Sequence, residues 1–225
     1  MNLNVENFKV LEVAGVEIWI TETIVNTWII MIILIVLAIL ARIKLRSFKV
    51  VPRGVQNVIE VIIEIFDNFV EDTLGDKLLY IAPWFFMVFM YLLASCLVSI
   101  FGLRAPTADW ATTFALALAS FVLMLAMGFK YRKGEYLKSF FEPHFVFFPI
   151  NIMGELAKPV ALSFRLFGNV LSGTVILSLY YALTPLWVQL GIPAILHAFF
   201  DLFFGALQTY IFVILSLMYI KGATE

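Results

Sequence analysis

Charged residues are scarce in this chain: only 14% of its 225 residues are Asp, Glu, Lys or Arg, whereas soluble domains have about 25%. Hydrophobic residues make up 63%, and the mean hydropathy is +0.99. A soluble protein of this size could not bury so much apolar surface, which excludes a water-soluble enzyme and a nucleic-acid-binding protein. At about 20 apolar residues per span, there is room for roughly five transmembrane helices.

Cysteine is nearly absent as well, and the single Cys96 excludes an internal disulfide. Basic residues are rare before the first apolar run, where only Lys9 stands against Glu6, Glu12, Glu17 and Glu22. A signal peptide requires a positive n-region and an organellar leader is rich in Arg and Ser. We therefore expect neither, and we place the chain in a bacterial plasma membrane. No metal site and no cofactor are expected.

The apolar segments predict an all-α polytopic membrane protein, with residues 1–225 forming a single membrane domain. The expected spans are 24–41, 80–101, 111–129, 144–182 and 193–220. The fourth, at ~39 residues, would extend about 58 Å against a hydrocarbon core of about 30 Å. It must tilt, break or begin as an interfacial piece, and Pro149 and Pro159 are the candidate break points. The fifth is also long, so we expect the two to form a tilted hairpin.

Basic residues give the expected orientation, because Lys and Arg favour cytoplasmic loops. They follow the first, third and last spans and include Arg42, Arg46, Lys130, Arg132 and Lys221. The other loops hold only Lys9 or Arg104. This alternation predicts an external N-terminus and a cytoplasmic C-terminus.

Residues 53–78 form a different kind of segment. Apolar residues recur there at helical spacing, with Glu60, Glu64, Asp67, Glu71 and Asp72 on the other side. Such an amphipathic helix lies along the membrane surface. Its acidic face is unusual for a contact with lipid alone, so a protein partner is an equal alternative.

Polar residues at membrane depth are costly and are by default functional candidates. Arg165, Asn169 and Ser172 are four and three residues apart, so they share one helix face. Gly168 and Gly173 leave little bulk beside them, which would let another helix approach closely. In the last run His197, Asp201 and Gln208 again fall on one face at α-helical spacing.

A hairpin estimate places Arg165 and Gln208 at similar depth, within roughly 5 Å at 1.5 Å per residue. The same estimate separates Arg165 from Asp201 by about 15 Å, beyond direct contact for upright helices. Arginine cannot lose its charge. The economical partner is therefore an acid supplied by another chain, facing the small residues. The alternative is a static arginine bonded to Asn169, Gln208 and backbone carbonyls.

Two further polar groups are expected above and below Arg165. Asp201, with Thr174 and His197, belongs toward the external side, although His197 could simply snorkel near the turn. Glu155 and Lys158 belong toward the cytoplasmic side, where a plain ion pair is the alternative. Together these groups suggest two aqueous routes that do not join.

The run from Lys158 to Asn169, Lys-Pro-Val-Ala-Leu-Ser-Phe-Arg-Leu-Phe-Gly-Asn, resembles the signature of subunit a of F-type ATP synthases. The element from Pro106 to Asp109 and the ending from Ala206 to Phe212 resemble the same family. Asp109 could otherwise simply cap the third span. The resemblance extends over nearly the whole chain.

The resemblance implies a non-catalytic stator beside a rotating ring of c subunits, with the b-subunit stalk and the remaining synthase subunits as further partners. Arg165 matches the essential arginine that faces the c-ring carboxylate, and Asn169 and Gln208 match positions on the same face. Asp201 and Thr174 match the external half-channel, where many members carry a Glu/His pair. Asn151 falls where a glutamate is common, and Glu155 would replace it on the cytoplasmic side. Proton or sodium flow would drive rotation.

Two other classes of protein make different predictions. A secondary transporter would show inverted repeats and a substrate-sized polar pocket, and the sequence shows neither. A passive membrane anchor would have no need of Arg165 at depth. The sequence leaves the ion, proton or sodium, open, because the ion ligands would lie mainly on the c subunit.

Overall fold

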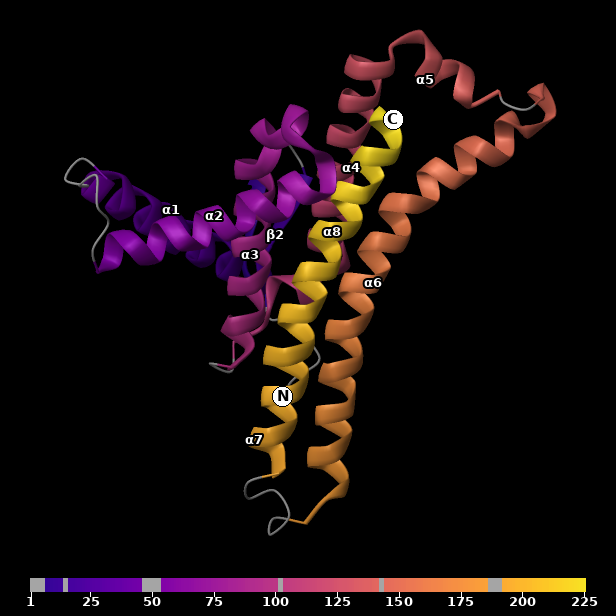
Figure 1. Ribbon diagram of the computed structural model, residues 1–225. Coiled ribbons are helices and arrows are strands. Elements are labelled where there is room, and N and C mark those ends of the chain that lie inside the picture. Colours follow the sequence, from indigo (N-terminus) through magenta and orange to yellow (C-terminus); the bar gives the residue numbers. More distant parts are fainter. Residues whose placement is uncertain (1–6, 14–15, 46–53, 101–102, 142–143, 186–191) are drawn as a thin grey trace.

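The computed structural model describes residues 7–13, 16–45, 54–100, 103–141, 144–185 and 192–225 (Figure 1). Two strands and a long first helix open the chain: β1 (Asn7–Val13), β2 (Val16–Thr21) and α1 (Glu22–Leu45). The middle holds α2 (Val55–Leu74), the 3-10 helix η1 (Asp76–Ile81), α3 (Ala82–Ile100), the 3-10 helix η2 (Pro106–Ala108), α4 (Trp110–Arg132) and α5 (Gly134–Ser139). The last part holds the 3-10 helix η3 (Phe145–Phe147), α6 (Phe148–Leu183), α7 (Ile192–His197), the π-helix η4 (Ala198–Phe204) and α8 (Gly205–Thr224).

Among the described residues, five helical segments are long and apolar enough to cross a membrane, which confirms the expected all-α polytopic architecture. They are Glu22–Lys44, Asp76–Ser99, Trp110–Arg132, Phe145–Leu183 and Ile195–Thr224. The amphipathic helix α2 is not one of them. A small antiparallel hairpin, β1 with β2, precedes α1 and was not expected. Its residues include several Val and Ile, which favour strands.

The long fourth segment is one helix and does not break. Pro149 lies in the first turn of α6, where a proline loses no helical hydrogen bond. Pro159 lies inside α6 and removes the N–H that would bond to the carbonyl of Glu155. Pro159 is buried in a part of the helix that faces α4 and α8. Neighbouring helices allow such prolines in membrane helices, so the break expected as one possibility at Pro159 is not found.

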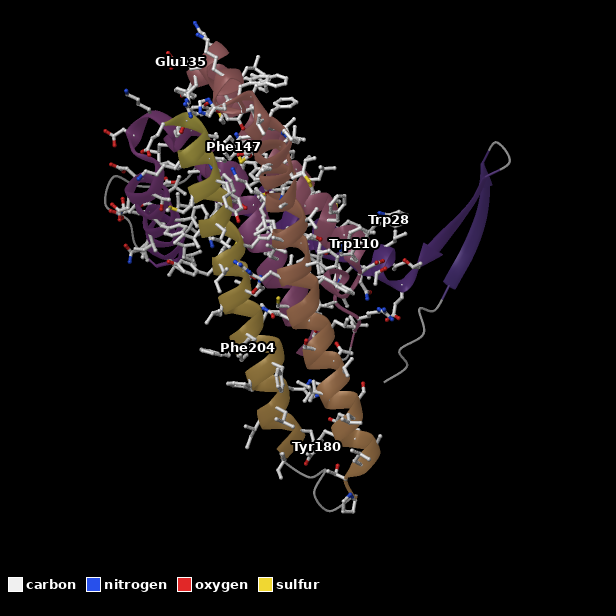
Figure 2. The ribbon with its side chains drawn as sticks, turned by 90° about the vertical axis from the view of Figure 1, so that its right-hand side faces the viewer. Trp28, Trp110, Glu135, Phe147, Tyr180 and Phe204 are labelled. Carbon is white, nitrogen blue, oxygen red and sulfur yellow. The ribbon has the colours of Figure 1, made fainter. Side chains whose placement is uncertain are left out.

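α6 and α8 lie side by side along most of their length (Figures 1 and 2). Between α7 and α8 the chain forms seven residues of π-helix. The π-helix bonds residue i to i+5 and is rare in proteins. The α-helical spacing that placed His197, Asp201 and Gln208 on one face therefore does not apply across this segment.

The core joins α2, α3, α4, α6 and α8. It includes Phe85, Leu92, Met124, Leu166 and Phe212, each at most 2% exposed. Only the second half of α2 enters it, because Phe66 and Val70 are buried while Val58, Ile62 and Ile65 are exposed. α1 exposes apolar side chains over most of its surface, as expected for a helix that faces lipid.

Candidate functional site

α4 fixes the orientation of α6. Leu162, Ser163 and Leu166 are buried, and the hydroxyls of Ser163 and Thr113 on α4 lie 3.3 Å apart within hydrogen-bond distance. Asp109 begins α4 as its N-cap, accepting a hydrogen bond from the N–H of Ala111, which confirms the capping alternative. Because this face of α6 is buried, the opposite face is directed outward.

The outward face carries the predicted polar residues. Arg165, Asn169 and Ser172 are all exposed on α6. The Ser172 hydroxyl donates to the carbonyl of Gly168 at 2.7 Å. Among the described residues, Arg165 forms no ion pair and no hydrogen bond. The guanidinium is thus presented to whatever lies beside this face.

Asn169 joins this outward face to α8. Its Nδ2 donates a hydrogen bond of 2.6 Å to Oε1 of Gln208, which is itself 2% exposed. Asn169 is one turn from Arg165, so this bond agrees with the estimated similar depth of Arg165 and Gln208. The bond does not reach Arg165 itself, so the static arrangement weighed from the sequence is not formed by these side chains.

The two glycines beside this face differ. A Cβ at Gly173 would lie 3.4 Å from Cβ of Phe200 in the π-helix, so this chain itself fills the space. A Cβ at Gly168 would meet nothing within 4 Å. Only Gly168 therefore leaves room for a neighbouring molecule.

Of the residues expected on the external side, His197 lies beside the last turn of α6 and Thr174 lies further back along that helix. His197 Nε2 lies 3.4 Å from the hydroxyl of Tyr181 on α6. The Thr174 hydroxyl donates to its own helix, at the carbonyl of Val170. Asp201 belongs to the π-helix, but its side chain lies outside the described residues. The structure therefore places Thr174 on α6 and His197 at the end of α7, the helix that faces it.

The residues expected on the cytoplasmic side lie on successive turns in the first third of α6. Lys158 Nζ pairs with Glu155 Oε1 at 2.5 Å, which is the ion pair weighed from the sequence. Asn151, one turn before Glu155, donates from Nδ2 to the carbonyl of Phe140 at 2.9 Å. Asn151 thereby ties the start of α6 to the end of α5.

Tyr136 on α5 lies near Glu155 in this region and was missed in the sequence. Its ring packs against Gly128 and lies edge-on to Phe140 at 5.3 Å between centroids. Burial raises the pKa of Tyr136 to about 12, and the negative charge of Glu155 acts in the same direction. The Tyr136 hydroxyl and Glu155 Oε2 are buried without a hydrogen-bond partner in the part of the chain that the structure describes.

Thr107 was also missed as a candidate site residue. It is fully buried in η2 and lines a pocket that also contains Asn169 and Gln208. Its signal in the sequence was its place in the element from Pro106 to Asp109, which carried part of the family resemblance. Only the fold brings that element next to Gln208.

Comparison with known protein families identifies the family of this chain. The family model described as "ATP synthase A chain" matches residues 24–221. The chain belongs to this family. It is therefore a non-catalytic membrane subunit of ATP synthase and forms the ion-conducting stator of the Fo sector, with proton or sodium as the ion.

Individual relatives agree with this membership. "ATP synthase subunit a, sodium ion specific" of Propionigenium modestum is 36% identical over 222 residues, which cover 91% of this chain and 74% of the relative. "ATP synthase subunit a" of Trichlorobacter lovleyi is 33% identical, covering 91% and 87%. The protein of the same description from Moorella thermoacetica is 36% identical, covering 89% of each chain.

Proposed function

We propose that Arg165 is the fixed positive charge that faces the ion-binding carboxylate of a neighbouring c-subunit ring. The observation that carries this proposal is an exposed guanidinium on a membrane helix with no ion pair among the described residues. A guanidinium in a bilayer costs at least about 2.5–3.5 kcal/mol on insertion scales. A carboxylate from another chain would offset this cost.

The charge of Arg165 determines the ionisation state of the carboxyl group in the proposed contact. A nearby positive charge favours the ionised form of a carboxyl group, so each arriving c-subunit carboxyl releases its ion beside Arg165. A bare carboxylate is costly in lipid, so it must take up an ion again before it leaves. Each charge that crosses the membrane yields about 2.3 kcal/mol per 100 mV, which drives rotation.

The ions reach this point through two offset half-channels in our proposal. Asp201, Thr174 and His197 line the external route, and Glu155, Lys158 and Asn151 line the cytoplasmic route. Asn169, Ser172 and Gln208 form the polar face beside the ring. The exposed Asn169 and Ser172, together with the open space at Gly168, support this assignment.

The wider setting follows from the same proposal. The whole chain, residues 1–225, acts as one membrane domain in a bacterial plasma membrane, with an external N-terminus and a cytoplasmic C-terminus. Its partners are the c ring, the b-subunit stalk and the remaining synthase subunits. The basic residues in the last turns of α1 and α4 support this orientation.

The test is Arg165→Ala in the assembled synthase, with Arg42→Ala at the exposed end of α1 as the matched control. Membrane vesicles are assayed for ATP-driven pumping with and without sodium, and subunit content is measured in parallel. We expect Arg165→Ala to abolish pumping while the complex still assembles, and Arg42→Ala to pump normally. Normal pumping by Arg165→Ala would refute the proposal.

A further inference from the structure

A small pocket lies on the side of the Asn169–Gln208 pair that faces α3 and η2. It is lined by Cys96 and Ser99 of α3, Thr107 of η2, Asn169 and Gly173 of α6, and Gln208 of α8, together with rings from the π-helix. The volume within the pocket that the centre of a water molecule can occupy is about 20 Å³. Holding one water requires roughly 10–15 Å³ by this measure, so the pocket is large enough.

Two buried polar atoms in the pocket lack a partner. Thr107 Oγ1 and Gln208 Nε2 form no hydrogen bond within the described parts of the chain, although Thr107 is 0% and Gln208 2% exposed. Both residues line the pocket. Buried polar groups are rarely left unsatisfied, and an ordered water is a common partner where the protein supplies none. The chemistry of the pocket therefore fits water.

The orientation of the Gln208 amide depends on such a partner. An amide can turn over and exchange its oxygen and nitrogen. In the observed orientation Oε1 accepts from Asn169 Nδ2. In the reversed orientation two NH₂ donors would face each other, unless Asn169 turned as well. An acceptor on the Nε2 side of Gln208 would hold the observed orientation.

We propose that Thr107 is a positioning residue: one water in the pocket accepts from Gln208 Nε2, bonds to Thr107 Oγ1, and so holds Gln208 in the orientation that receives Asn169. A hydroxyl both donates and accepts, so Thr107 can serve this water in either direction. The role deepens the proposed function, since it matters for ion flow only if Asn169 lies beside the ring-facing Arg165.

The first test uses the protein's single cysteine as a probe of water in the pocket. Silver ion is hydrated and reacts with thiols, and Cys96 lines the pocket. Vesicles that contain the intact synthase are treated with silver, and ATP-driven pumping is compared between the wild type and Cys96→Ala. We expect silver to inhibit the wild type more strongly than Cys96→Ala. Equal responses would mean that the pocket is closed to water and would overturn the proposal.

The second test removes the hydroxyl at nearly constant shape. Thr107→Val should lower ATP-driven pumping by roughly 3- to 10-fold, the range for the loss of one hydrogen bond, and Thr107→Ser should restore it. In a Gln208→Leu background, Thr107→Val should have no further effect, because both act through the same water. A merely structural threonine would give independent, multiplying effects, and that result would overturn the proposal.

Thr209→Val is the matched control. Thr209 is a buried neighbour of Gln208 in sequence, but its hydroxyl donates to the carbonyl of Gly205 in its own helix. We expect this variant to change pumping less than twofold. Failure of the inference is distinguishable from failure of the proposed function. If Arg165→Ala is inactive while Thr107→Val pumps normally, only the role of Thr107 is wrong; if Arg165→Ala pumps normally, the proposed function itself is wrong.

Discussion

Asn169 and Gln208 join α6 to α8 through a side-chain hydrogen bond of 2.6 Å, one helical turn from Arg165. Asn169 is exposed while Gln208 is buried, so the bond runs from the outer face of α6 into the interior. This hydrogen bond links the outward polar face of α6 to the rest of the bundle.

This bond predicts energetic coupling between the two residues. Hydrogen bonds between membrane helices contribute about 0.6 kcal/mol on average and up to about 1.7 kcal/mol. We expect Asn169→Leu and Gln208→Leu to show a coupling energy in this range when the free energy of unfolding in detergent micelles is measured for both single variants and the double variant. Strictly additive effects would contradict the bond.

Gly168 provides a test of the outward face that is independent of charge. The chain leaves open space there, so Gly168→Leu should still insert and fold. If a ring packs closely on this face, the added bulk should weaken the contact by about 1–3 kcal/mol, as overpacking does. Pumping and co-purification of the c subunit are the measurements. Gly222→Leu, which also meets open space, is the control and should leave both unchanged.

Gly205 of α8 lies directly against Cys96 of α3. A Cβ at Gly205 would lie 2.8 Å from Cβ of Cys96, too close without a backbone shift. Gly205→Ala should therefore destabilise the fold by about 1–3 kcal/mol, and Cys96→Gly should recover part of this loss in the double variant. Thermal unfolding in detergent measures both.

The control for Gly205→Ala is Gly154→Ala in α6, where a Cβ meets nothing within 4 Å. Alanine favours a helix over glycine by up to about 1 kcal/mol, so this variant should be neutral or slightly more stable. A loss at Gly154 equal to that at Gly205 would show that the contact with Cys96 is not the cause.

Tyr136 predicts a dependence of stability on alkaline pH. Its pKa is about 12 in the folded protein, against about 10 in an unfolded chain. The unfolded state therefore releases this proton first, and the contribution of the neutral hydroxyl is complete below about pH 10 and lost as the pH rises toward about 12. The wild type should lose more thermal stability than Tyr136→Phe over this interval.

At pH 8 the wild type should no longer be at a disadvantage from ionisation of Tyr136, and we compare its stability with that of Tyr136→Phe there as well. The Tyr136 hydroxyl is buried without a partner among the described residues, and such a group costs about 1–3 kcal/mol. Tyr136→Phe should therefore be at least as stable as the wild type at that pH. Tyr210→Phe, at an exposed tyrosine of α8, controls for the loss of one tyrosine. A marked destabilisation by Tyr136→Phe at pH 8 would show that the hydroxyl has a partner.

The spans and the position of Arg165 could be predicted because both depend on local physics. Apolar run length locates membrane helices, and the spacing of Arg165, Asn169 and Ser172 places them on one face of any α-helix. The depth estimate for Gln208 succeeded for a similar reason, since a hairpin of two helices has a fixed rise per residue.

Other features depend on contacts that no local pattern contains. The π-helix of 198–204 changes the spacing of its residues, and nothing in the run of phenylalanines announces it. Pro159 has the local character of a helix breaker, yet packing allows α6 to continue through it. Tyr136 reaches its place because α5 packs against α4, and Thr107 because η2 packs against α6. Their distance along the chain from Arg165 does not reveal either contact.

The exposed guanidinium of Arg165 also has a consequence for the assembly of this chain in the membrane. In a newly inserted copy, this charge would face the lipid acyl chains. The bilayer would then thin locally and water would enter it near Arg165. Covering the outer face of α6 would remove that defect. Assembly and the sealing of the bilayer against leakage would then be a single event for this chain.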